Sequence, residues 1–323
     1  MNSERATWKL LSRLLQSRRL RLTLTVAAMG ALLFIAWQHR LTIAHMLATA
    51  NPWLLGISTL LSLLANYVSG LSFNSFLRHQ GIKISAGRAC YLQLVAQVTK
   101  YIPGKIWSAV LQAQLIESKR VGAMLVAGID NTVFMVLCVA ATGLALLAAP
   151  TYPAAFVAIA LTGWITAAVI AVSTGLTRFI ERIGKWTGNT LPANFPLSKK
   201  METVHLFVFA FFHTLVQTTS VITLLMATTP YSADDILIGT ASILLAWIVG
   251  TAAIIIPSGL VVREVTFVYL ATTFGVAADP TSLTAIAIVA RAAQTLPDIM
   301  AALLVIGVES TRIVRSPRHA PHR

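Results

Sequence analysis

The stretch QLVAQVTKYIPGKIWSAVLQAQL, residues 93–115, decides the fold of this chain. It lies inside a longer apolar segment, 86–117, and places Pro103 and Gly104 between two lysines. Proline removes a backbone donor and disfavours helical geometry in the residue before it. We therefore expect one helix to end near Tyr101 and a second helix to begin near Gly104.

The composition of the whole chain indicates a membrane protein. Of its 323 residues, 56% are hydrophobic and only 11% are charged, and the mean hydropathy is +0.75. A soluble domain carries about 25% charged residues. Apolar runs near the ~20 residues that cross a bilayer recur along the chain, whereas the ~10-residue alternating segments of a membrane barrel do not. We predict an all-α, polytopic helical membrane protein.

The net charge of +14 follows membrane topology rather than nucleic acid binding. Basic residues cluster at the N-terminus, in short loops and in the C-terminal tail, as the positive-inside rule describes. No nucleic-acid-binding motif accompanies them. We predict a basic cytoplasmic segment at 1–19, a transmembrane domain at 20–310 and a basic cytoplasmic tail at 311–323, in a cytoplasmic (inner) membrane.

Loop charges give each apolar segment a direction. The outer loops, which carry few or no bases, are 38–52, 150–153, 229–235 and 278–281. Six spans follow, at 20–37, 53–77, 121–149, 154–177, 203–228 and 281–307. Segments 86–117 and 235–277 each begin and end on one side, so we predict two broken re-entrant hairpins that enter from opposite faces. Splitting 235–277 into two short spans, which gives eight in total, fits the loop charges equally well.

The two hairpins suggest an inverted repeat. Each sits between two of the predicted spans, and the two three-part units have opposite orientations. Their breaks correspond, with Ile-Pro-Gly at 102–104 and Ile-Pro-Ser-Gly at 256–259. Interrupted apolar segments at matching positions of two inverted halves indicate a binding site near the midplane of a transporter.

The charged residues near the two breaks predict an anion site. A helix that begins after a break presents free N–H groups and the positive end of its dipole. Lys100 and Lys105 flank the first break, and Arg263 and Glu264 follow the second. Arg291 lies near the middle of the last span, where a charge costs at least about 2.5–3.5 kcal/mol and therefore needs a partner. We expect these four bases to bind an anionic ligand.

Static ion pairing is the alternative for the same residues. Arg263 with Glu264, Arg291 with Asp298, and Asp130 with a base could pin helices together. Arg291 and Asp298 are seven residues apart and share one helix face. For His213 in the span 203–228 we expect an interhelical hydrogen bond. We predict no catalytic residue, no metal site and no cofactor, because no catalytic motif or ligand cluster is present.

Two motifs resemble the lysylphosphatidylglycerol synthase transmembrane-region family, a family of flippase-like integral membrane proteins. The first is KYIPGKIW at 100–107, which matches the family's lysine-tyrosine-x-proline-glycine-lysine-like stretch at Lys100, Tyr101, Pro103, Gly104 and Lys105. The second is IIPSGLVVRE at 255–264, which matches the other family stretch at Pro257, Gly259, Leu260, Arg263 and Glu264. Val261 stands where the family commonly has glycine. The resemblance covers roughly 20–310.

The resemblance implies a lipid flippase and not an enzyme. It implies movement of an anionic phospholipid or a lipid-linked glycan precursor across the membrane. The headgroup would be held by Lys100, Tyr101, Pro103, Gly104, Lys105, Arg263, Glu264 and Arg291, with Asp130 and Asp298 as ion-pair or coupling residues. The expected partner is a membrane lipid with an anionic headgroup. Two alternatives stay open: a membrane enzyme, or an accessory protein that recruits enzymes of glycolipid or cell-envelope polysaccharide biosynthesis.

Overall fold

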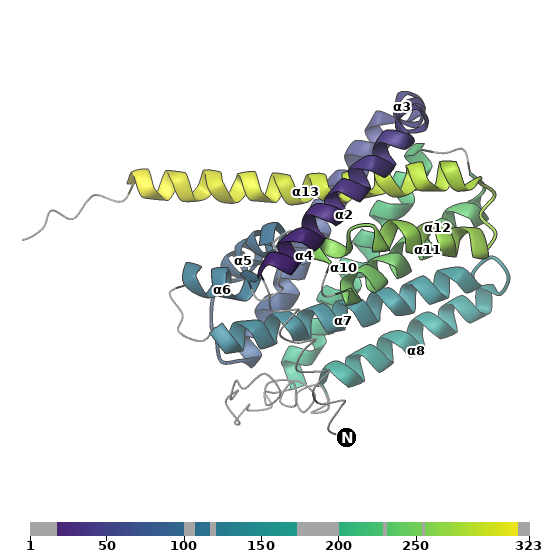
Figure 1. Ribbon diagram of the computed structural model, residues 1–323. Coiled ribbons are helices and arrows are strands. Elements are labelled where there is room, and N and C mark those ends of the chain that lie inside the picture. Colours follow the sequence, from purple (N-terminus) through teal and green to yellow (C-terminus); the bar gives the residue numbers. More distant parts are fainter. Residues whose placement is uncertain are drawn as a thin grey trace, which may run out of the picture.

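The computed structural model describes residues 18–99, 107–116, 121–172, 200–228, 231–253 and 256–315. All regular elements in these ranges are helices, which confirms the all-α prediction. The first half contains α2 Arg18–Gln38, α3 Arg40–Thr49, α4 Pro52–His79, α5 Ala86–Thr99, α6 Trp107–Leu115, α7 Val121–Ala148 and α8 Pro153–Val172. The second half contains α10 Lys200–Thr228, α11 Ala233–Ala252, the 3-10 turn η1 Pro257–Gly259, α12 Val262–Thr273 and α13 Pro280–Arg315. Figure 1 shows a helical bundle from which the C-terminal part of α13 projects.

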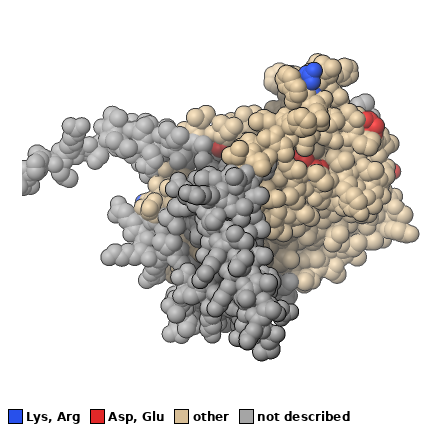
Figure 2. All heavy atoms as spheres, in the orientation of Figure 1, with Lys and Arg blue, Asp and Glu red and all other residues tan. Residues whose placement is uncertain are grey.

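The long helices carry the membrane-spanning character of the chain. Within the described residues, α4, α7, α10, α11 and α13 are long and apolar enough to cross a membrane. Large apolar side chains lie exposed on their outer faces, including Leu64, Leu144 and Leu215. On the face drawn in Figure 2, most of the described surface carries neither basic nor acidic residues. These features confirm a polytopic helical membrane protein.

The first hairpin consists of α5 and α6. These helices have 14 and 9 residues, so they rise about 21 and 14 Å, and neither crosses a ~30 Å hydrocarbon core. Arg88 at the start of the hairpin donates from Nη2 to the carbonyl oxygen of Leu115 at its end, over 2.9 Å. The two ends of the segment therefore lie together, as expected for a re-entrant hairpin.

The second hairpin, built from α11, η1 and α12, is asymmetric. Its first arm, α11, has 20 residues and is long enough to span the membrane alone. Its second arm, α12, has 12 residues and rises only about 18 Å, which is too short for a separate span. Asp235 near the start of α11 accepts a 2.9 Å hydrogen bond from the N–H of Ala277 after α12. The structure thus favours the hairpin over two separate spans, although one of its arms is long enough to cross the membrane.

The packing of the helices supports the inverted repeat. In the first unit α5 packs against α4 and α6 against α7, and in the second unit α11 packs against α10 and α12 against α13. Between the units, α7 packs against α11 and α13 packs against α5. Exchanging α4–α7 for α10–α13 maps each of these interfaces onto another one. The two units therefore share an internal arrangement as well as matching breaks.

Helices α4 and α10 form the central contact between the units. The N–H of Asn51 donates to Ala227 O over 2.9 Å. Ser58 and Ser220 exchange hydroxyl-to-carbonyl hydrogen bonds of 2.8 and 2.7 Å. The His213 ring nitrogen Nδ1 lies 2.9 Å from Ala65 O, which confirms the expected interhelical hydrogen bond. Successive contacts advance along α4 and retreat along α10, so the two helices are antiparallel, and the small serines and alanines allow close approach.

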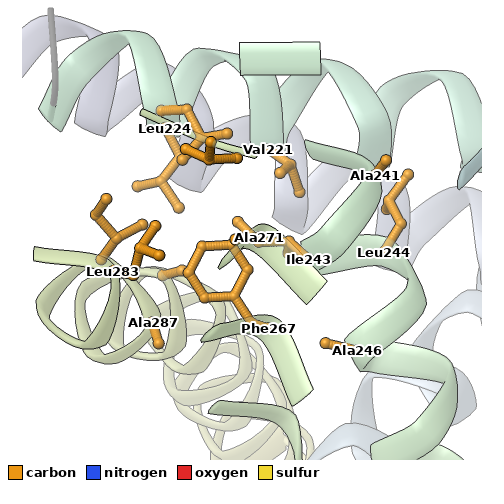
Figure 3. Packing of buried hydrophobic residues seen from close by; sticks show 14 of the residues in the cluster. Val221, Leu224, Ala241, Ile243, Leu244, Ala246, Phe267, Ala271, Leu283 and Ala287 are labelled. Carbon is orange, nitrogen blue, oxygen red and sulfur yellow. The ribbon is translucent and has the colours of Figure 1, made fainter. Parts of the chain in front are cut away.

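Two buried apolar clusters fill the two units. One contains Phe73, Phe134 and other side chains of the first unit. The other surrounds Phe267 of α12, which Figure 3 shows facing side chains of α13 and α11. Met46 of α3 also belongs to this second cluster. The segment 38–52, which we predicted as an outer loop, thus contains a helix that packs against the bundle.

Candidate functional site at the second helix break

The break in the second hairpin has an unusual backbone. Ser258, Gly259 and Val261 all have positive φ angles, of 54°, 63° and 69°. Glycine adopts this left-handed region readily, whereas serine and the β-branched valine do so only at a cost of order 1–3 kcal/mol each. Such strain persists only where the surroundings enforce it, and it concentrates at functional sites.

Glycines let the break lie directly on α11. A Cβ atom on Gly259 would stand 2.6 Å from both the Cα and the O of Gly250, so these two backbones touch. A Cβ on Gly250 would in turn collide with Cγ of Arg263. The stem of Arg263 therefore crosses α11 at Gly250, and its Cζ lies 5.9 Å from the ring centre of Trp247, within cation–π range.

Arg291 of α13 also reaches the break. Its Nη2 donates to the carbonyl oxygen of Ser258 over 3.2 Å, and its Nε lies 3.8 Å from Oε1 of Glu264. The side chains of Arg291 and Glu264 are only 8% and 7% exposed, so both charges are buried. A 3.8 Å separation is an ion contact rather than a short hydrogen bond. The pair is therefore close enough for mutual neutralisation but is not locked by hydrogen-bond geometry.

Two buried oxygen atoms at the break have no hydrogen-bond partner within the described part of the chain. They are Oε2 of Glu264 and Oγ of Ser258. A cavity of ≈ 30 Å³ adjoins Glu264 and Arg291. It is lined by Ile243, Ala246, Trp247, Arg263, Glu264, Phe267, Ala287, Ala290, Arg291 and Gln294. This volume holds a water molecule but not a lipid headgroup, so the site is too narrow for a headgroup in this conformation.

The structure brings together the predicted charged residues of the second half. Arg263, Glu264 and Arg291 line one cavity. Asp298, which follows Arg291 by seven residues and shares its face of α13, is also buried. Glu264 pairs with Arg291, whereas the sequence suggests Arg263 with Glu264 and Arg291 with Asp298 as static pairs. Asp130 is half-buried on α7 and is not among the residues that line this cavity.

The predicted residues of the first break, Lys100, Tyr101, Pro103, Gly104 and Lys105, lie outside the described residues. The helix that leads to them, α5, ends at Thr99 and packs against α13, which also packs against α12. One helix, α13, therefore contacts both hairpins.

Two further features of the first unit were not predicted from the sequence. Ser69 Oγ accepts from Gln93 Nε2 at 3.2 Å and from Asn131 Nδ2 at 3.4 Å, which joins α4, α5 and α7. An open apolar groove of ≈ 310 Å³ lies between α4 and α5. It is lined by Leu60, Leu63, Leu64, Tyr67 and Leu94. Sequence spacing alone gave no signal for either feature, because each joins helices that are distant in the chain.

A comparison with known protein families gives a match for this chain. The family described as lysylphosphatidylglycerol synthase TM region matches residues 19–302. The chain belongs to this family. The matched range covers both hairpins and extends past Arg291 and Asp298, which confirms the resemblance seen in the two motifs. None of the curated proteins compared with the chain matches it.

Membership of the lysylphosphatidylglycerol synthase TM region family, together with the spanning helices, indicates an integral membrane protein of lipid or cell-envelope biosynthesis or transport. The family's second motif forms the break itself. Leu260 is buried, and Arg263 and Glu264 line the cavity. Val261, where the family commonly has glycine, occupies one of the left-handed positions, so a glycine would fit there without strain.

Proposed function

We propose that this protein is a lipid translocase that moves an anionic phospholipid or a lipid-linked glycan precursor across the cytoplasmic membrane. One observation carries the proposal: Arg263 and Arg291 both line the cavity at a broken membrane helix, with Glu264 as the one acid among the described residues that line it. Two guanidinium groups at one break in the membrane favour an anionic guest. A phosphate group is the anionic feature that both proposed lipid classes share.

The start of α12 strengthens the attraction for an anion. Its N-cap, Val261, makes no side-chain hydrogen bond to the first turn of the helix. The N-terminal N–H groups and the dipole of α12 thus add positive potential at the break. We propose that Lys100 and Lys105 approach the same headgroup from the first hairpin, which would surround the phosphate with four bases.

The arrangement of the two units supports a transport cycle. The units meet along α4 and α10, and each hairpin packs against a helix of the other unit. Rocking of one unit against the other around the α4–α10 contact would open the narrow cavity to one face of the membrane and then to the other. The acyl chains would remain in lipid, and the groove between α4 and α5 offers apolar surface for one of them.

We propose transport rather than catalysis because Glu264, the acid nearest the break, already faces Arg291. We also propose that both termini are cytoplasmic, following the basic segments 1–19 and 311–323. Enzymes of cell-envelope biosynthesis would be the functional partners, since they would supply or consume the translocated lipid.

Leaflet exchange tests this function. The protein is reconstituted in vesicles that contain fluorescent phosphatidylglycerol, and a membrane-impermeant quencher reports how much label moves to the outer leaflet. We expect faster exchange than in empty vesicles and at least a tenfold loss for Arg263→Gln or Lys105→Ala. Arg40→Gln is the matched control, because Arg40 lies exposed on α3 against Trp37. Exchange at the rate of empty vesicles by the unmodified protein would refute the proposal.

A further inference from the structure

We propose that Glu264 takes up a proton when an anionic headgroup binds Arg291, so that protons are coupled to lipid binding at the second helix break. The inference rests on the proposed function for the nature of the anion. It adds the coupling ion and assigns the atom that carries it, which neither the family nor the motifs supply.

A bound phosphate and the Glu264 carboxylate would compete for the guanidinium of Arg291. Arg291 uses Nε toward Glu264 Oε1 and Nη2 toward Ser258 O. A phosphate that approaches Arg291 must displace this carboxylate from at least part of the guanidinium. A buried carboxylate that loses its cation is strongly disfavoured in a low-dielectric site, and protonation is the usual way in which such a group is neutralised. The ion contact of 3.8 Å is open enough for this exchange.

Oε2 of Glu264 is the atom that would receive the proton. Oε1 of Glu264 faces Arg291, whereas Oε2 is buried and has no hydrogen-bond partner within the described residues. The adjoining cavity of ≈ 30 Å³ has room for a water molecule that can deliver a proton. The step is balanced: hydronium gives its proton to the carboxylate, which leaves a neutral carboxylic acid and water, and no other bond changes.

The surrounding charges make the direction of coupling clear. On α12 itself Arg263 precedes Glu264, and from α13 Arg291 lines the same cavity while Asp298 lies further along the buried face. The acids of α11, Asp234 and Asp235, lie in its first turn, on the opposite end from Gly250. In the empty site Oε1 of Glu264 lies 3.8 Å from Nε of Arg291. A phosphate bound to Arg291 would cancel part of the positive charge beside this carboxylate, and the proposed coupling is therefore proton uptake on binding.

A static salt bridge predicts different behaviour. If Glu264 only held Arg291 in place, binding of an anion would involve no proton, and removal of the carboxylate would weaken the site. In the proposed exchange, Glu264→Gln imitates the protonated state. This variant should therefore bind anionic lipid at least as tightly as the unmodified protein, but without proton uptake.

Calorimetric titration in buffers of different ionisation enthalpy measures both quantities together. The purified protein in detergent is titrated near neutral pH with short-chain phosphatidylglycerol, with inorganic phosphate and with phosphatidylcholine. We expect uptake of up to about one proton per phosphatidylglycerol bound, by linkage of the two equilibria. Inorganic phosphate ionises near neutral pH itself, so its linkage is read as the difference in proton uptake between the unmodified protein and Glu264→Gln, which should equal that for phosphatidylglycerol if the phosphate alone is recognised. Phosphatidylcholine should show none.

The variants separate the possible outcomes. Glu264→Gln should bind phosphatidylglycerol with no proton uptake, Glu264→Asp should retain uptake, and Asp234→Asn, a carboxylate control at the other end of α11, should match the unmodified protein. Binding without proton uptake by the unmodified protein, or unchanged uptake by Glu264→Gln, would overturn the inference. Proton-linked binding without leaflet exchange would contradict the translocase but support the coupling, and absence of anion binding would refute both.

Discussion

The carboxylate of Asp235 and the backbone N–H of Ala277, 42 residues apart, meet in a 2.9 Å hydrogen bond that joins the two ends of the second hairpin. Arg88 and Leu115, 27 residues apart, meet in the same way at the end of the first hairpin. The two hairpins thus use opposite charges for the same purpose. A base at the proposed cytoplasmic face agrees with the positive-inside rule.

Loss of the Asp235 carboxylate should loosen the second hairpin. Asp235 also receives a hydrogen bond from the hydroxyl of Ser232 at 2.7 Å, so it organises both ends of the segment. We expect Asp235→Ala to lower the free energy of unfolding by about 1 kcal/mol, a modest value because the group is partly exposed. Thermal unfolding in detergent measures this change. The neighbouring Asp234→Ala is the control, and an equal loss in both variants would show that the hydrogen bond to Ala277 is unimportant.

The left-handed valine predicts a stabilising substitution. Val261 has a φ angle of 69°, where glycine is favoured over a β-branched residue by about 1–2 kcal/mol. The greater flexibility of glycine in the unfolded chain offsets about 0.5–1 kcal/mol of this gain. We therefore expect Val261→Gly to raise the free energy of unfolding by up to about 1 kcal/mol. In the same thermal assay Val262→Gly, inside the first turn of α12, should be destabilising, and a lower midpoint for Val261→Gly would argue against strain at the break.

The sequence was sufficient for the hairpins because their signals are local. Pro257 and Gly259 interrupt an apolar segment, and the loop charges on either side fix its direction. The same information places the break at Pro257, which leaves room for a first arm of the length of α11. It gave no sign of α3, because a segment with a single base, Arg40, between two spans has the composition of either an outer loop or a short packed helix.

The partner of Glu264 was equally beyond the sequence. Arg263 is adjacent in the chain, yet the structure pairs Glu264 with Arg291 of the next helix. Adjacent residues on a helix point about 100° apart, so Arg263 extends over Gly250 toward Trp247 while Glu264 turns toward α13. Which cation the carboxylate meets depends on how α12 packs against α13. That packing is a tertiary property, and charge counting cannot supply it.

The cap of α13 should give stability a dependence on acidic pH. Hydrogen bonds from Ser282, with a smaller contribution from the N–H of Thr281, hold the pKa of Asp279 below its usual range. Because the folded value is lower than the unfolded value near 3.9, this contribution is present above about pH 4 and is lost as the pH falls through the folded value. Midpoints of thermal unfolding across acidic pH should therefore fall less steeply in Asp279→Asn. Identical slopes in both proteins would exclude Asp279 as a source of the dependence.

A single methyl group at Gly250 should displace Arg263. The Cβ of Gly250→Ala would collide with Cγ of Arg263, near the base of that side chain, so the whole stem must shift, and we expect the free energy of unfolding to fall by about 1–3 kcal/mol. The displaced guanidinium should also reduce exchange of fluorescent phosphatidylglycerol per folded protein about tenfold, because about 1.4 kcal/mol of lost binding suffices for that factor. Gly128→Ala on α7 is the matched control, since nothing lies within 4 Å of its added Cβ. Normal exchange by Gly250→Ala would mean that the position of Arg263 over α11 has no role in transport.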